Sequence, residues 1–160
     1  MSANPADWCI RKAGLEDLEQ VVRLRLALMC ELHAPAPGEL DAWASATRRY
    51  LMSALPSGRF HVWLAFAGDE AVSCGGLSPF ERPPAPGNLS GLEGYILNMY
   101  TVPTWRKRGV SRALLADLMA FARELGMGRL WLHASDDGRS LYESVGFAPN
   151  LTALEWTPGP

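Results

Sequence analysis

The segment from Tyr95 to Ala134 constrains the fold more than any other part of this 160-residue chain. It begins with "YILNMYTV", a run of β-branched and aromatic residues typical of a buried strand, which Pro103 ends. After Gly109, apolar residues recur at helical spacing as far as Gly126, and "GRLWLHA" then predicts a second strand. Because a strand, a helix and a strand in this order form a crossover, we expect the two strands to be parallel neighbours in one sheet.

The remaining elements are predicted from the same kinds of pattern. We expect strands at 8–12, 59–67, 71–80 and 147–156, and helices over 15–31, 39–55 and 137–145. The strands at 59–67 and 71–80 are joined by the tight turn "GDE" and form an antiparallel hairpin. Residues 81–94, rich in proline and glycine, predict a surface loop or a lid. The sequence thus predicts an α/β fold of mixed α+β type, with helices covering the faces of a mixed sheet.

Length and composition narrow the class of protein. A chain of this size fits one domain, so we expect residues 1–160 to form a single unit. The formal net charge of −2 gives no general attraction to nucleic acid or anionic lipid. The sequence shows no signal-peptide pattern and no apolar run near the roughly 20 residues that span a bilayer. Its cysteines are few, odd in number and without metal-ligand spacing. We therefore expect a cytoplasmic protein with reduced thiols, no metal, and no nucleic-acid or membrane partner.

The densest positive charge of the chain comes just before a predicted helix. Arg106, Lys107, Arg108 and Gly109 follow one another, and the apolar helical pattern begins at Val110. A helix start leaves four backbone N–H groups unpaired and carries partial positive charge, so it binds phosphate readily. Glycine also lets the backbone approach a ligand closely. This segment therefore predicts an anion site, for phosphate or pyrophosphate.

Three other interpretations of the basic segment are weaker. A solvated helix start without a ligand would place cations against the helix dipole, at a cost of roughly 0.3–1 kcal/mol each. A nucleic-acid patch would be short, in a chain that is otherwise not basic and has no recognised binding motif. A dinucleotide site would require G-x-G-x-x-G, and only Gly109 is present here.

Two motifs in this order resemble those of the GNAT superfamily of N-acetyltransferases. The first is Arg106-x-x-Gly109-x-Ser111 followed by "RALL", and the second is "SDDGRSLYESVGF", from Ser135 to Phe147. The opening "IRKAGLEDLEQVVRLR" is also similar. The resemblance implies a central mixed, mostly antiparallel sheet of about six to seven strands, flanked by about four helices. It also implies direct transfer of the acetyl group of acetyl-coenzyme A to a primary amine in a ternary complex, where the amine belongs to a small molecule or a protein.

The resemblance assigns coenzyme-binding roles to particular residues. Backbone groups of Met99 and Thr101 would pair with the pantetheine arm like an added strand. Ser135 stands where the family often has asparagine, and Ser111 where glycine or alanine is usual. The amides that would hold the pyrophosphate belong to Arg106, Lys107, Arg108, Gly109, Val110, Ser111 and Arg112.

The resemblance also suggests a general acid, but the general base stays open. Tyr142 matches the family tyrosine that protonates the departing thiolate, although a tyrosine in a short amphipathic helix usually packs against the core. Tyr95 stands where some members carry a glutamate base. Glu93 and Glu31 are alternative carboxylates, Glu31 as part of the acceptor pocket, and each is more often a solvated surface group. Water-mediated deprotonation and capture of the neutral amine are further routes.

Other residues give no strong functional signal. His33, His61 and His133 are scattered, so a structural role is favoured for each. The absence of a carboxylate at Tyr95 supports a second hypothesis, in which the chain is a catalytically weak module that binds acyl-coenzyme A as a sensor or scaffold. A nucleotide-binding regulator using the same anion site is a third. An exposed sheet edge would permit a homodimer.

Overall fold

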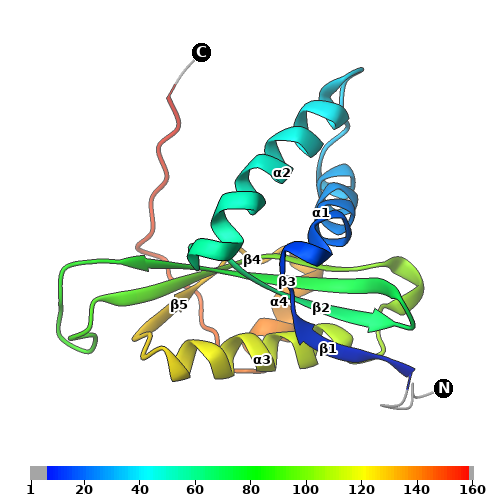
Figure 1. Cartoon of the computed structure of the whole chain (residues 1–160). Helices are drawn as coiled ribbons and strands as arrows, with labels where there is room; N and C mark the ends of the chain where they lie inside the picture. The colour runs from blue at the N-terminus through cyan, green and yellow to red at the C-terminus, as the bar shows by residue number, and fades with distance from the viewer. Residues whose placement is uncertain (1–6, 159–160) are drawn as a thin grey trace.

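The structure, a computed structural model, describes residues 7–158. The described strands form one five-stranded sheet, and helices cover both of its sides (Figure 1). Two short 3-10 turns, Leu15–Asp17 and Pro103–Trp105, precede α1 and α3. In chain order the elements are β1 (Cys9–Lys12), α1 (Leu18–Leu32), α2 (Glu39–Ser57), β2 (His61–Ala67), β3 (Glu70–Glu81), β4 (Leu92–Thr101), α3 (Val110–Glu124), β5 (Arg129–Trp131) and α4 (Asp136–Glu143).

The sheet follows chain order, β1-β2-β3-β4-β5. The first four strands pair antiparallel, and β4 pairs parallel with β5. The predicted hairpin of β2 and β3 and the predicted parallel crossover through α3 are therefore both confirmed. The mixed, mostly antiparallel sheet flanked by four helices is also as predicted.

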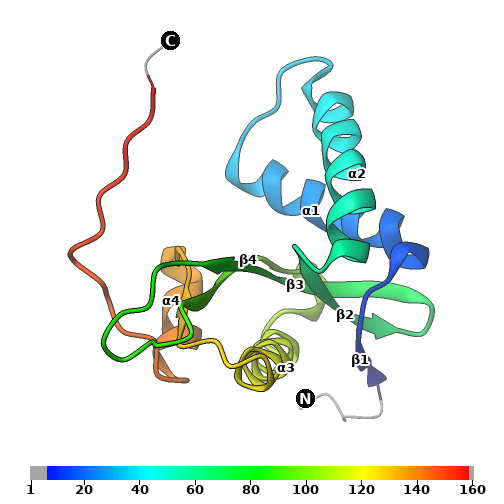
Figure 2. The same cartoon turned by 60° about the vertical axis from the view of Figure 1, so that its left-hand side comes forward.

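The helices bury two separate cores against the two faces of the sheet. On one face stand α1 and α2, and on the other α3 lies along the sheet with α4 beside it at the β5 end (Figures 1 and 2). Val21, Leu51 and Leu64 belong to the first core, and Leu114 and Leu118 to the second. Helix α3 places its predicted stripe of apolar residues toward the sheet, because side chains three and four apart share one helix face. This arrangement fixes the end of β4, the turn and the start of α3 against the sheet.

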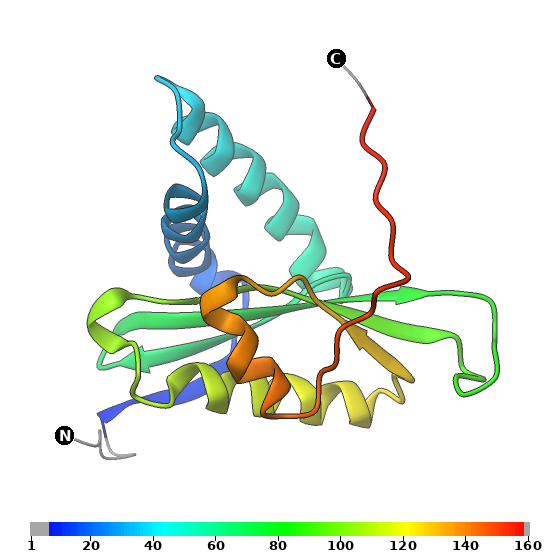
Figure 3. The ribbon, with the colours of Figure 1, turned by 180° about the vertical axis from the view of Figure 1, so that it is seen from behind.

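The predicted strand at 147–156 is wrong. After α4 the described chain runs away from the sheet as an extended segment without strand pairing (Figure 3). Asn150 Oδ1 accepts from the backbone N–H of Thr152 at 3.1 Å and from its hydroxyl at 2.7 Å, which forms a local turn. Such local bonds compete with a strand ladder, and Pro149 has no N–H to give one. The described sheet therefore has five strands instead of six to seven.

Smaller differences concern where elements begin and end. Strand β4 starts at Leu92, three residues before the predicted position, so the loop is shorter than 81–94. Helix α2 continues past Pro56 to Ser57, and Gly58 ends it with a left-handed conformation. None of the described helices is long and apolar enough to cross a membrane. Cys9, Cys30 and Cys74 are all free thiols.

Candidate functional site

The start of α3 has the features expected of an anion site. Gly109 precedes the helix with φ +83°, and Lys107 also has a positive φ, of 60°. No side chain of the described residues caps this helix end, and its first turn contains no acidic residue. The N–H of Ala113 bonds to the carbonyl of Gly109 at 3.1 Å, which leaves the amides before it without a helical partner. Free amides together with the dipole favour a bound anion here.

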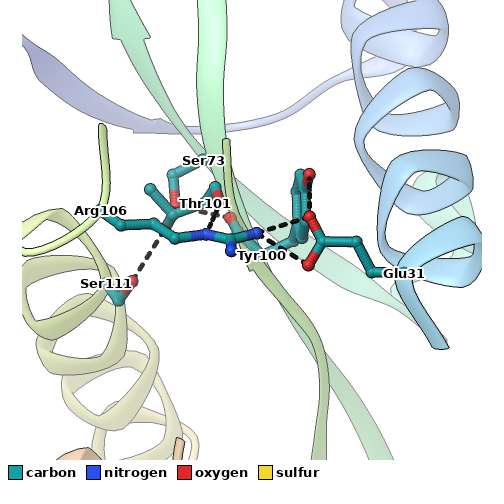
Figure 4. A network of polar contacts seen from close by, with 6 residues as sticks. All are labelled: Glu31, Ser73, Tyr100, Thr101, Arg106 and Ser111. Carbon is teal, nitrogen blue, oxygen red and sulfur yellow. Dashed lines mark hydrogen bonds and ion pairs between the residues drawn. The ribbon is translucent and has the colours of Figure 1, made fainter. Parts of the chain in front are cut away.

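Arg106 differs from its basic neighbours, because its charge is paired within the protein. One guanidinium nitrogen lies 2.6 and 2.8 Å from the two carboxylate oxygens of Glu31, at the end of α1. Its Nε donates to the carbonyl of Thr101 at 2.9 Å, and the hydroxyl of Tyr100 donates to Glu31 at 3.0 Å (Figure 4). The hydrogen bond and charge of Glu31 raise the pKa of Arg106. The pair therefore joins the end of α1 to the basic turn.

Glu31 is thus a partner of Arg106 and Tyr100 and lies beside the turn. Both side chains of the ion pair remain partly exposed, at 43% for Arg106 and 44% for Glu31. Lys107 is exposed and Arg108 lies over the ring of Trp105 at 4.8 Å. Two cations therefore stay at the surface of the turn, where they are available to an anion.

A chain of hydroxyl groups connects the sheet to the helix start. Ser73 Oγ donates to the carbonyl of Tyr100 and lies 2.7 Å from Thr101 Oγ1, which in turn lies 2.8 Å from Ser111 Oγ (Figure 4). Ser111 stands where the family usually has glycine or alanine. Its side chain turns toward the sheet to make this bond, so the first turn of α3 accommodates the serine.

Strand β4 is bent by a β-bulge that the sequence did not predict. Asn98 has φ +58°, and the register with β3 shifts so that Asn98 and Met99 stand opposite Gly75 alone. Asn98 donates from Nδ2 to Cys74 Sγ at 3.5 Å, and Cys74 Sγ donates to the Asn98 carbonyl at 3.1 Å. Asparagine tolerates positive φ better than most residues, which is a weak signal in the sequence alone.

The pairing of β4 with β5 ends before the bulge. Their parallel ladder covers residues 93–95 of β4 and ends at the pair of Tyr95 and Trp131, whereas β4 continues to Thr101. The N–H of Val102 donates to Val72 in β3. Because backbone groups alternate sides along a strand, those of Met99 and Thr101 point away from β3. Apart from the Thr101 carbonyl, which accepts from Arg106, these groups face the side that β5 leaves open.

A cavity of about 800 Å³ lies beside β5 and is lined by residues of α3, α4 and the segment after α4. Tyr142, on α4, belongs to its lining and packs with its ring centroid 5.9 Å from that of Phe147. Burial raises the pKa of Tyr142. Tyr142 is therefore neutral at ordinary pH and retains a proton to donate.

Two other predicted positions have structural partners. Ser135 precedes α4, and its Oγ accepts from the backbone N–H of Gly138 at 3.2 Å, which makes it the N-cap of that helix. Glu93 is only 4% exposed, so it is not the solvated carboxylate that its place near a loop favoured. It accepts a hydrogen bond from the indole N–H of Trp131 and lies 3.8 Å from Arg82.

Tyr95 has a partner that sequence reasoning assigned to packing alone. Its hydroxyl forms a hydrogen bond with Nδ1 of His133, which lies two residues beyond the end of β5. Both side chains line the cavity that Tyr142 also lines. Burial raises the pKa of Tyr95. The two residues are 38 positions apart in the sequence, which explains why periodicity gave no sign of this contact.

The family model for the acetyltransferase (GNAT) family matches residues 26–147. The match covers most of the chain and includes the turn, the bulged strand and α4. The family match and the fold therefore identify an acyltransferase. This chain belongs to the GNAT acetyltransferase family.

Solved structures resemble this chain over nearly its whole length. A predicted acetyltransferase from Clostridium acetobutylicum, solved with acetyl-CoA, is 28% identical with a TM-score of 0.84, over 94% of this chain and 96% of that one. A GCN5-related N-acetyltransferase from Ralstonia eutropha JMP134 is 31% identical with a TM-score of 0.82, over 95% and 99%. An aminoglycoside acetyltransferase from an uncultured soil metagenomic sample, 17% identical with a TM-score of 0.73 over 98% of both chains, shares the fold. No protein of curated function matches the sequence.

Proposed function

We propose that this chain transfers the acetyl group of acetyl-coenzyme A to a primary amine, with both substrates bound at once. The observation that carries the proposal is the start of α3, where free amides and two surface cations stand beside the open side of β4. The Clostridium acetobutylicum relative was solved with acetyl-CoA, which supports the same coenzyme for this chain.

The residues of the chain fit the parts of the coenzyme. The backbone of Met99 and Thr101 would bind the pantetheine arm, because an extended ligand can add to an open strand edge. The pyrophosphate would lie at the start of α3, at the amides of Lys107 through Arg112, whereas the backbone N–H of Arg106 is already bonded to the Pro103 carbonyl at 3.3 Å. Ser135, as the N-cap of α4, would contact the coenzyme through its backbone or its hydroxyl. Glu31 fixes Arg106 and would form part of the acceptor side.

Proton transfer is the chemistry that the side chains would supply. Acetyl-coenzyme A brings a thioester, and a thiol with a pKa near roughly 8.5 is a tolerable leaving group. Tyr142 would donate its phenolic proton to the sulfur as the carbon–sulfur bond breaks. The buried position that raises its pKa keeps that proton in place until it is needed. A neighbouring cavity gives the acceptor amine room to approach.

A second candidate is a module that binds acyl-coenzyme A with little turnover. This candidate is favoured because the nearby carboxylates already have partners and are less available as a general base. Glu31 is paired with Arg106, and Glu93 with Trp131. Tyr95 also stands where some members carry a glutamate. On this second candidate, the anion site would work as proposed, and acyl transfer would be negligible.

Replacement of Tyr142 by phenylalanine tests the enzyme proposal. We expect Tyr142→Phe to lower kcat by about 10²-fold, at the low end for general acid catalysis because the thiolate leaves readily. The dissociation constant for acetyl-coenzyme A should stay unchanged. Free thiol released with a panel of primary amines gives kcat, and calorimetric titration gives the dissociation constant. Tyr50→Phe, a half-exposed tyrosine on α2, is the matched control.

The outcomes separate the two candidates. Equal turnover by Tyr142→Phe and wild type would contradict the acid role. Tight binding of acetyl-coenzyme A without thiol release from any amine would favour the binding module. Wild-type protein that fails to bind acetyl-coenzyme A would overturn both candidates.

A further inference from the structure

The pair of Tyr95 and His133 has a position that packing alone does not explain. Its hydrogen bond joins β4 to the end of β5 at the point where the parallel ladder stops. The two rings lie 5.7 Å apart between centroids and are tilted by 50°. His133 is exposed although it follows a strand of the sheet. A polar pair at the mouth of the opening between two strands therefore meets whatever enters it.

The two sides of the opening carry different groups. Leu130 and Leu132 pack into the core on the α3 side, and Tyr142 packs with them. Because side chains alternate along a strand, Trp131 points to the opposite face, where α1 and α2 stand, and His133, beyond the end of β5, contacts Tyr95 of β4. Tyr142 and His133 nevertheless line the same cavity. They would reach a substrate in the opening from opposite sides.

We propose that His133 is the general base of the transfer reaction and that Tyr95 positions its ring. The inference rests on the proposed function. The base role requires the tautomer in which Nδ1–H of His133 donates to the Tyr95 hydroxyl oxygen, because the lone pair of Nε2 is then left for the acceptor amine. Glu31 and Glu93 are both paired, with Arg106 and Trp131, whereas His133 offers a proton acceptor in direct contact with Tyr95.

The proton and electron balance closes with these residues. The amine nitrogen forms a bond to the acetyl carbon with its lone pair, and His133 Nε2 takes the proton that the nitrogen loses. The carbon–sulfur bond breaks with its electron pair on sulfur, and Tyr142 protonates the sulfur. Solvent then returns the proton from the imidazolium of His133 to the phenolate of Tyr142. The net products are an acetamide and free coenzyme A thiol.

The charged surroundings of His133 bear on its pH dependence. Beside Tyr95 and Tyr142, the titratable or charged groups that line the cavity are Arg123, Arg129, Arg139 and Glu143. Glu155, in the segment after α4, acts on Tyr95 through its charge. A general base must be unprotonated to act, so a loss of rate on the acid side is the expected signature of this base.

The kinetic test compares His133→Gln with wild type and with His61→Gln. His61 lies on β2, packs against Phe121 with ring centroids 4.7 Å apart, and does not line the cavity. We expect His133→Gln to lower kcat by about 10²–10⁴-fold and to remove the acid-side fall in rate. Tyr95→Phe should lower kcat less and shift the acid-side fall. The assay measures thiol release from acetyl-coenzyme A with the most active amine of the panel, or with water if no amine reacts.

A second measurement does not depend on turnover. The protein has three histidines, so the Cε1–H signal of His133 is assigned by its disappearance in His133→Gln. We expect coenzyme A, used as the probe, to shift this signal and to leave those of His33 and His61 in place. Tyr95→Phe should change the pH titration of the His133 signal.

Each outcome decides the inference. If His133→Gln turns over at the same rate and with the same pH profile as wild type, the base assignment is overturned and the proposed function stands. A His133 signal that does not respond to coenzyme A would also overturn it, as would a loss of stability in His133→Gln that accounts for the whole fall in rate. Failure of wild type to bind acetyl-coenzyme A would overturn the proposed function and this inference with it.

Discussion

The left-handed conformation of Gly109 gives a direct test of the anion site. Gly109 has φ +83°, and a Cβ built on it meets no described atom within 4 Å. A valine would therefore fit, and its penalty would come from the backbone. An L-residue held in the left-handed region costs roughly 1–2 kcal/mol. If the turn relaxes to avoid this strain, acetyl-coenzyme A must restore the conformation when it binds. This cost raises the dissociation constant for acetyl-coenzyme A by about 5–30-fold.

The matched control lies at the other end of the same helix. Gly126 has φ +72°, and a Cβ there also meets nothing within 4 Å. We expect Gly109→Val and Gly126→Val each to lose at most about 1–2 kcal/mol of the free energy of unfolding in urea titrations, the upper value applying where the turn keeps its left-handed conformation. Only Gly109→Val should raise the dissociation constant for acetyl-coenzyme A, measured by calorimetry. Unchanged binding by folded Gly109→Val, or equal weakening by Gly126→Val, would refute the assignment of the anion site.

The remaining predictions concern two buried titratable groups, Cys74 and Asp17. Burial raises the pKa of Cys74 to about 12, so the folded protein holds this proton more tightly than the unfolded chain. The free energy of unfolding should therefore fall as pH rises from about 9 toward 12, and an equal fall in Cys74→Ala would contradict this. A thiol reagent should react with the exposed Cys9 and Cys30 in native protein, and with Cys74 only after denaturation. The hydrogen bond from Arg11 lowers the pKa of Asp17, so its contribution to stability is present above the ordinary carboxyl value and is lost as pH falls through the lowered one. Asp17→Asn should cost about 1–3 kcal/mol at pH 7 and flatten the acid side of the stability profile, and an acid side as steep as in wild type would count against this pairing.

The elements that the sequence predicted well are those whose signals are local. The apolar stripe of α3, the strand β4 and the basic turn between them each occupy one continuous segment, so periodicity and turn residues sufficed to place them. The segment 147–156 carried a similar strand signal but lacks a paired partner in the described sheet. A strand depends on its neighbour for hydrogen bonds, and the local turn at Asn150 satisfies those of Thr152 instead.

The candidate site likewise has a part built from residues that are neighbours in the chain and a part built from residues far apart in it. The candidate anion site could be located from the sequence because its amides, its glycine and its cations are neighbours in the chain. The pairs of Glu31 with Arg106, Glu93 with Trp131 and Tyr95 with His133 could not, since they join residues 75, 38 and 38 positions apart. Their existence depends on how α1 and β5 lie against β4, which no local pattern encodes.

The ion pair of Arg106 explains how the chain keeps cations at a helix start without much cost. Its guanidinium turns away from the helix axis to Glu31 and to the carbonyl of Thr101, so its charge opposes the dipole less. Arg108 is held over the ring of Trp105 in a similar way. The amides of the first turn of α3 thus remain free while the local charge stays positive. Because Glu31 lies in the last turn of α1, which ends at Leu32, the same contact also ties that helix to the basic turn.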